Sequence, residues 1–124
     1  MKTALYCRVA LADQVAIGLQ ERSLSCYAAG NGYTDCVVYR DNGASGLTLN
    51  RPGMNRLLAD THSGKIQNII ATDLARIARN PTLTMELLDI AERQGVKVVT
   101  VQDGELNALF DSQMKAIFQH SSTV

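Results

Sequence analysis

The stretch Leu5-Tyr6-Cys7-Arg8-Val9-Ala10 decides how the rest of this chain can be arranged. It is apolar apart from one arginine and stops before the polar pair Asp13-Gln14, which is typical of a buried first strand that ends in a loop. Arginine is almost never buried without an anionic partner, so we expect Arg8 to point outward at the strand end, toward a negative group. Three further arginines stand in loop-like contexts, at Arg51, Arg76 and Arg79.

Length and composition predict one globular domain that spans residues 1–124, with 46% hydrophobic residues and a formal net charge of zero. No apolar run reaches the roughly 18 residues of a membrane span, and no signal peptide is visible. Three cysteines without C-x-x-C spacing favour reduced thiols and a cytoplasmic location. Because DNA affinity comes largely from neutralised phosphates, an uncharged domain is expected to bind DNA weakly by itself.

Strand-like and helix-like segments alternate along the chain. The strands are expected at 3–9, 36–39, 66–71 and 96–101, and the helices at 14–29, from an Asn50 N-cap to before Ser63, and from Asn80-Pro81 to Gly95. This alternation predicts an α/β three-layer sandwich, with a central, mostly parallel sheet of four or five strands flanked by helices.

A last helical pattern runs through the end of the chain. Its apolar positions fit either a core helix or a partner interface, and the sequence favours neither. They are Leu106, Leu109, Phe110, Met114, Ile117 and Phe118.

The four arginines are expected at the same edge of the sheet. Function gathers at the carboxyl ends of parallel strands, and segments 8–14, 41–46 and 72–79 and the turn at Gln102-Asp103 all follow strands. Guanidinium groups hold phosphate oxygens bidentately, and several around one phosphorus stabilise a negatively charged transition state without a metal. The alternative is that these arginines are solvated or paired with Asp13, Asp41 and Asp73, and that Asp41-Asn42-Gly43 is merely a turn.

No cofactor or metal is expected, because the chain lacks a G-x-G-x-x-G motif and a His/Cys/Asp cluster.

Five short motifs in order resemble the catalytic domain of the serine site-specific recombinases, the resolvase/invertase family, over residues 3–101. They are Tyr6-x-Arg8-Val9-Ala10-x-x-x-Gln14, Gln20, Asp41-x-Gly43-x-Ser45-Gly46, Arg51-Pro52-Gly53-Met54 and Asp73-Leu74-Ala75-Arg76-Ile77-Ala78-Arg79-Asn80.

The resemblance implies a resolvase-like fold and DNA cleavage and rejoining through a phosphoserine link, with no metal or nucleotide cofactor. The family's nucleophilic serine falls on Ala10. Its phosphate-binding arginines match Arg8, Arg51, Arg76 and Arg79, and its active-site glutamines match Gln14 and Gln20. Ala75 stands where many members have Asp or Ser, which leaves Asp73 as the acid that could serve instead.

The family also implies a homodimer or tetramer formed through a long C-terminal helix, followed by a DNA-binding domain. Residues 1–124 are expected to include only the beginning of that helix, and no DNA-binding domain.

The residues at positions 10 and 11 leave two possible functions for the chain. The Ala10 methyl group cannot form an ester with phosphate, and Leu11 replaces a threonine that often follows the serine. Ser45 and Thr72, the nearest hydroxyl groups, lie off the first strand, so we do not expect them to replace it. The chain is therefore either a recombinase catalytic domain that does not cleave DNA or a non-catalytic dimerisation or regulatory module of a mobile-element protein. A flavodoxin-like ligand binder is disfavoured because the first loop has no glycine.

Overall fold

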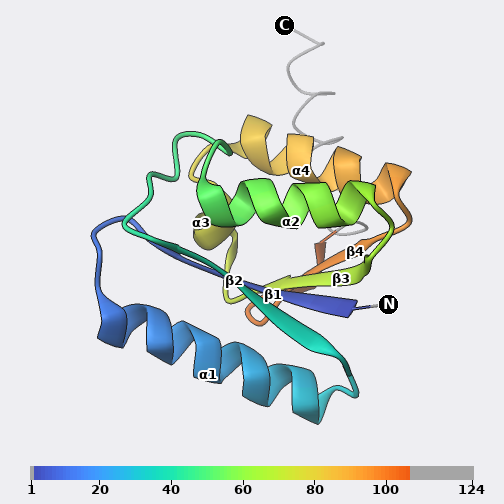
Figure 1. Cartoon of the computed structure of the whole chain (residues 1–124), viewed down its shortest axis with the longest axis horizontal. Coiled ribbons are helices and arrows are strands. Elements are labelled where there is room, and N and C mark those ends of the chain that lie inside the picture. Colours follow the sequence, from blue (N-terminus) through green and yellow to red (C-terminus); the bar gives the residue numbers. More distant parts are fainter. Residues whose placement is uncertain (1, 107–124) are drawn as a thin grey trace, which may run out of the picture.

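A computed structural model describes residues 2–106 and contains a five-stranded sheet of order β2-β1-β3-β4-β5, with helices on both faces (Figure 1). All neighbouring strands are parallel except β4 and β5. This confirms the predicted three-layer α/β fold. The strands are β1 (Lys2–Val9), β2 (Cys36–Asn42), β3 (Ile66–Ala71), β4 (Lys97–Thr100) and β5 (Gly104–Glu105), and the helices are α1 (Gln14–Gly30), α2 (Pro52–His62), α3 (Leu74–Ile77) and α4 (Pro81–Arg93).

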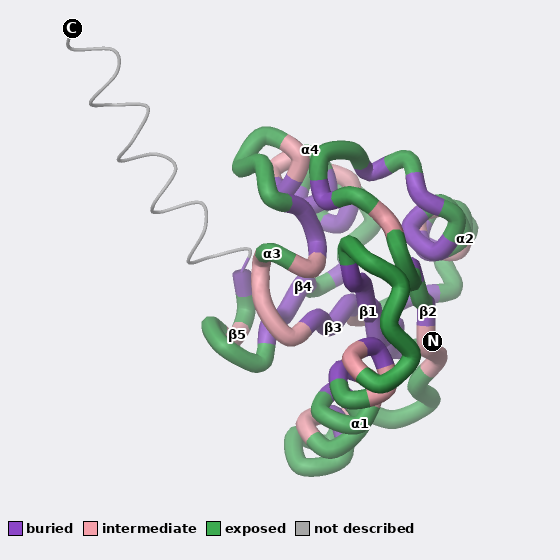
Figure 2. Tube along the Cα trace, turned by 90° about the vertical axis from the view of Figure 1, so that its left-hand side faces the viewer, coloured by how far each residue is buried: buried purple, intermediate pink, exposed green. Residues whose placement is uncertain are grey.

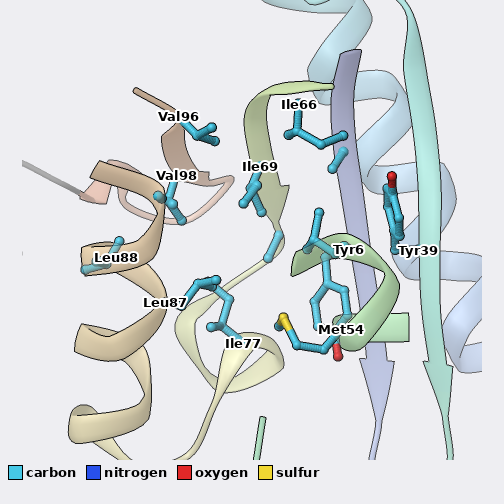
Figure 3. Close-up of a cluster of buried hydrophobic side chains, with 14 of the residues drawn as sticks. Tyr6, Tyr39, Met54, Ile66, Ile69, Ile77, Leu87, Leu88, Val96 and Val98 are labelled. Atoms are coloured by element: carbon cyan, nitrogen blue, oxygen red, sulfur yellow. The ribbon is translucent and has the colours of Figure 1, made fainter. Parts of the chain in front are cut away.

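The strand β1 lies between two parallel neighbours and is buried from Thr3 to Val9. Because side chains alternate along a strand, β1 contributes to both hydrophobic layers. Leu5, Cys7 and Val9 pack with α1, whereas Ala4 and Tyr6 pack on the other face with α2, α3 and α4. Figure 3 shows this second cluster, and Figure 2 shows the buried residues running along the strands between exposed helix faces.

The starts of α1 and α4 follow from local side chains. The carboxylate of Asp13 accepts hydrogen bonds from the backbone N–H groups of Val15 and Ala16, both at 3.0 Å. Asn80 accepts from Thr82 N at 2.8 Å, next to Pro81. Both arrangements are N-caps that satisfy otherwise unpaired backbone donors.

The prediction that Asn50 caps α2 was wrong. Arg51 occupies the N-cap position without a capping side-chain bond, and Asn50 Oδ1 instead accepts from Asn55 Nδ2. The free N–H groups of Gly53 and Met54 donate to the carboxylate of Asp41 at 2.7 and 2.9 Å. The cap of α2 therefore comes from β2, which a search for local capping residues cannot find.

Three other boundaries differ from the sequence prediction. The strand β2 continues to Asn42, and the short helix α3 and the antiparallel strand β5 were not predicted. The predicted end of α4 is confirmed, since Gly95 follows it with a φ of 69°. Of the final apolar pattern, Leu106 is buried in the layer of α2 and α4, and the remaining positions lie outside the described residues.

Within residues 2–106, no helix combines the length and the apolar character that crossing a membrane requires.

Gly53 marks the closest approach of α2 to β2. A Cβ atom there would press into the carbonyl oxygen of Arg40 and lie 2.9 Å from Asp41 Oδ2. We expect Gly53→Ala to lower the free energy of unfolding by about 1–3 kcal/mol in urea denaturation, because backbone must move to admit the methyl group. Gly18→Ala in α1 is the matched control, since its Cβ meets nothing within 4 Å and the substitution should be neutral or stabilising. Equal losses in both variants would contradict this packing.

Candidate functional site

Arg8 lies at the carboxyl end of β1 but does not point outward as predicted. It is only 1% exposed, and its guanidinium group donates to three backbone carbonyl groups. Nε donates to Arg76 O at 3.0 Å, and Nη1 and Nη2 donate to Ala44 O and Ala75 O, each at 2.7 Å. The loop that contains Ala44 and the short helix α3 cover the strand end and supply carbonyl dipoles in place of a carboxylate, which lets the charge be buried. Burial, and next the nearby positive charge of Arg51, lower the pKa of Arg8.

Arg51 is the second buried guanidinium group, at 2% exposure. Its Nε donates to Thr48 O at 2.7 Å, its Nη1 to the hydroxyl of Tyr6 at 2.5 Å, and its Nη2 to the carbonyl of Ile77. Arg8 and Arg51 therefore hold the segment 75–77 against the tip of β1 from two sides.

Arg76 and Arg79 are more accessible. The side chain of Arg76 is 36% exposed and its Nη1 donates to Arg8 O at 3.4 Å. Its Nε is buried, forms no hydrogen bond within residues 2–106, and lies 3.8 Å from Asp73 Oδ2. Arg79 is exposed, and its backbone N–H donates to Gly46 O at 3.0 Å.

The predicted convergence of the four arginines is supported by the geometry around Gly46. A Cβ atom at Gly46 would lie 2.9 Å from Arg79 Cγ and 3.1 Å from Arg8 Nη2, so both side chains lie against Gly46. The charges of Arg51, Arg76 and Arg79 all act on the pKa of Arg8. The first three strands end at this edge of the sheet, as Figure 1 shows for β1 and β2.

The alternative interpretation of the sequence was that aspartates pair with the arginines. The structure shows such a pair at one place. Among residues 2–106, the one ion pair formed by the four arginines is that of Arg76 with Asp73. Asp13 caps α1, and Asp41 accepts from the N-terminus of α2. The described site therefore carries excess positive charge.

The two glutamines differ in role. Gln20 is buried and braces the backbone of Arg8, accepting from its N–H at 3.1 Å and donating to its carbonyl at 2.8 Å. Gln14 begins α1 with an exposed side chain. The structure thus places Gln20 against the end of β1, and Gln14 at the start of α1, directly after the loop that follows β1.

Ala10 follows β1 and is exposed. The preceding carbonyl, Val9 O, accepts from Gly43 N at 2.9 Å and Ala44 N at 3.0 Å, so the 43–46 loop lies against this position. The hydroxyl of Ser45 accepts from Leu47 N, and that of Thr72 donates to Asp73. Each of these two hydroxyl groups, the nearest that could replace the missing nucleophile, therefore forms a hydrogen bond within its own segment.

A family model described as "Resolvase, N terminal domain" matches residues 3–122. The chain belongs to the resolvase family. Its fold resembles the N-terminal catalytic domain of TP901-1 integrase, with a TM-score of 0.88, 25% identity, and coverage of 99% of this chain and 98% of that one. It also resembles a resolvase family site-specific recombinase from Streptococcus pneumoniae, with a TM-score of 0.72, 27% identity, and coverage of 99% and 94%.

A curated Bacillus subtilis (strain 168) protein, "Putative DNA recombinase", is 27% identical over 106 residues. The match covers 85% of this resolvase domain but 21% of that protein, so the domain spans about a fifth of its length.

Sequence reasoning missed two residues of the site of this resolvase domain, Tyr6 and Asp41. The Tyr6 hydroxyl donates to Asp41 Oδ2 at 2.7 Å and accepts from Arg51, which links the arginine site to the start of α2. Burial, and next the hydrogen bond to Asp41, raise the pKa of Tyr6 and keep it protonated. Interpreting Asp41-Asn42-Gly43 as a turn was wrong for the first two residues, which lie in β2. Strand alternation offered a signal, because Tyr39 and Asp41 share a face, as do Tyr6 and Arg8.

Within residues 2–106, no group of three or more His, Cys, Asp or Glu side chains is placed to hold a metal ion.

The three cysteines of the resolvase domain should differ in reactivity. Cys7 is buried beside α1, and burial raises its pKa to about 11, whereas Cys26 and Cys36 are exposed. We expect a disulfide reagent at pH 8 to modify two thiols per native chain quickly and the third only after urea denaturation, because attack requires an accessible thiolate. The folded state keeps the Cys7 proton to higher pH than the unfolded state does. The free energy of unfolding should therefore fall as the pH rises from about 9 to about 11. Rapid modification of all three thiols in the native chain would show that the reagent reaches Cys7 on β1 in the folded state, and would contradict this prediction.

Proposed function

We propose that this chain is the catalytic domain of a site-specific DNA recombinase, which binds a DNA phosphodiester but does not cleave it. The observation that supports this most is the gathering of Arg8, Arg51, Arg76 and Arg79 at the tip of β1, with one carboxylate 3.8 Å from one of them. Related chains described as recombinases and integrases give the reaction class. In the family that reaction is strand cleavage and rejoining through a phosphoserine link.

The arrangement suits an incoming anion. A guanidinium group has five N–H donors, and Arg8 uses three of its own on carbonyl groups. The half-buried guanidinium group of Arg76 and the exposed Arg79 add further donors next to it. A phosphate bound among these groups offsets the repulsion between the positive charges of the arginines, which the nearby carboxylate does not fully compensate. In this proposal Arg8 and Arg51 chiefly hold the 75–77 segment in place, while Arg76 and Arg79 contact the phosphate.

Ala10 limits the chemistry. It occupies the exposed position just past Arg8 and Val9 where the family's serine attacks phosphorus, and a methyl group supplies neither a nucleophile nor a proton. Loss of the nucleophile in a serine enzyme costs on the order of 10⁶ in rate. Binding without strand cleavage follows.

A second candidate function, association with an active homologue, is favoured by apolar surface near the site. Leu11 is 85% exposed and Leu47 is 75% exposed, on the two loops that meet beside Ala10, and Val15 follows on α1. We infer a homodimer or tetramer formed through the C-terminal helix that the sequence predicts; its positions after Leu106 lie outside the described residues. Sedimentation of a strict monomer at high concentration would count against this association. A cytoplasmic location is part of the same proposal.

The phosphate-binding role is tested by Arg79→Gln. We expect fluorescence anisotropy with a labelled DNA duplex at low salt to show weaker binding, and the slope of log affinity against log salt to fall by about one. Arg93→Gln is the matched control, because Arg93 ends α4 at the far edge of the sheet and pairs with Asp89. Equal effects of the two substitutions would indicate non-specific attraction and contradict the proposed site.

A further inference from the structure

A pocket lies against the segment that carries Arg76 and Arg79, between α3 and the first turn of α4. Its volume is about 400 Å³ and its walls are mainly apolar. It is lined by Leu74, Ala75, Ala78, Arg79, Pro81 and Thr84.

The pocket and the arginine cluster share this segment. The carbonyl of Ala75 accepts from Arg8 Nη2 at 2.7 Å, while the same residue lines the pocket. Arg79 forms part of the wall and also meets Arg8 across Gly46. An anion held by Arg76 and Arg79 is therefore next to the pocket entrance.

The mainly apolar walls and the neighbouring arginines suit an apolar group that is attached to an anion. Leu74, Ala78 and Pro81 offer hydrocarbon surface, and two alanines leave room that larger side chains would fill. Arg79 is the one charged residue of the lining, and none of the lining residues is acidic. In DNA the phosphate is esterified to the sugar, and the sugar carries the base, so both groups arrive with a bound phosphate.

We propose that the pocket receives the sugar and base of the nucleotide next to the bound phosphate in one DNA strand. This inference rests on the proposed phosphodiester site and adds a nucleoside subsite to it. Arg79 contacts both parts of the ligand, the phosphate through its charge and the nucleoside through its stem. Burial of about 55 Å² of apolar surface of the nucleoside would correspond to roughly tenfold in affinity.

The test compares two phosphodiesters by NMR titration of the chain, labelled in backbone amides and methyl groups. Dimethyl phosphate carries the anion alone, and thymidylyl-thymidine adds a nucleoside on each side. We expect the dinucleotide to bind about tenfold more tightly, because its nucleoside buries apolar surface in the pocket. The methyl signals of Leu74, Ala78 and Thr84 should shift with the dinucleotide and stay in place with dimethyl phosphate.

A pocket-filling variant gives a second readout. Thr84→Met should remove the advantage of the dinucleotide and leave the affinity for dimethyl phosphate unchanged. Thr82→Met, on the exposed side of the same helix, should preserve both affinities. If Thr84→Met disturbs folding, the methyl shifts of the unaltered chain still decide the matter.

Three results would overturn a part of this account. Equal affinities without pocket shifts would refute the nucleoside subsite and leave the phosphodiester site intact. Pocket shifts with thymidine alone that equal those with the dinucleotide would make the pocket an independent apolar site and refute the link. Absence of binding by both phosphodiesters would refute the proposed function itself.

Discussion

The Ala10→Ser variant is expected to form a covalent link to DNA that the unaltered chain does not form. Position 10 is exposed just after β1, and two hydrogen bonds with the Gln20 side chain fix the backbone of Arg8, two residues earlier. A serine hydroxyl there would stand beside the arginine cluster that we propose holds the phosphate. Because the nucleophile of a serine enzyme contributes on the order of 10⁶ in rate, its restoration should change an undetectable reaction into a measurable one.

The measurement uses a pool of DNA duplexes with a randomised central sequence, since the target site is unknown. Adducts that survive detergent are isolated, and mass spectrometry locates the phosphoserine. Leu11→Ser is the matched control, because it places the same hydroxyl one residue farther along and should give no adduct. Ala75→Asp is added to Ala10→Ser to supply the acid that many family members have. If neither Ala10→Ser alone nor Ala10→Ser combined with Ala75→Asp forms an adduct, the claim that the rest of the catalytic site is retained would be contradicted.

The Asp41→Ala substitution is expected to destabilise the fold by the largest amount of any single change at the site. The carboxylate accepts from Gly53 N, Met54 N and the Tyr6 hydroxyl at 2.7–2.9 Å, and Asp41 is 4% exposed. Its removal leaves three buried donors without that acceptor, and each such group costs about 1–3 kcal/mol. We expect a loss of about 3–5 kcal/mol in urea denaturation, a large part of the 5–15 kcal/mol typical of a domain.

Asp13→Ala provides the comparison. Asp13 also accepts from two backbone N–H groups at a helix start, but it is exposed, so water replaces the lost acceptor. We expect a loss of about 1 kcal/mol. Similar losses in the two variants would show that the Tyr6–Asp41 contact does not join β1, β2 and α2.

The alternation of strands and helices and the mostly parallel sheet followed from the sequence because they depend on local patterns. The apolar runs in β1 and β3 and the alternation of strand and helix were enough for a parallel sheet. The cap of α2 was not predictable in this way, because Asp41 is separated from Gly53 by 12 positions. The two residues of β5 and the four of α3 are too short for a periodic signal.

The meeting of the arginines was predicted from strand ends, but their individual roles were not. Arg8 was expected to point outward, toward a negative group, because arginine is almost never buried without an anionic partner. Its actual acceptors are carbonyl groups of Ala44, Ala75 and Arg76, and any residue supplies such a group. The division into two buried and two accessible arginines therefore depends on loop paths that residue types do not specify.

The central claim is that these arginines form one anion site beside Ala10, and the arginine Nε–Hε NMR signals test it most directly. During titration with dimethyl phosphate, we expect the signals of Arg76 and Arg79 to shift saturably with a common dissociation constant. Those of Arg22 on α1 and Arg93 on α4 should shift little. Shifts at Arg76 and Arg79 no larger than those at Arg22 and Arg93 would contradict the account.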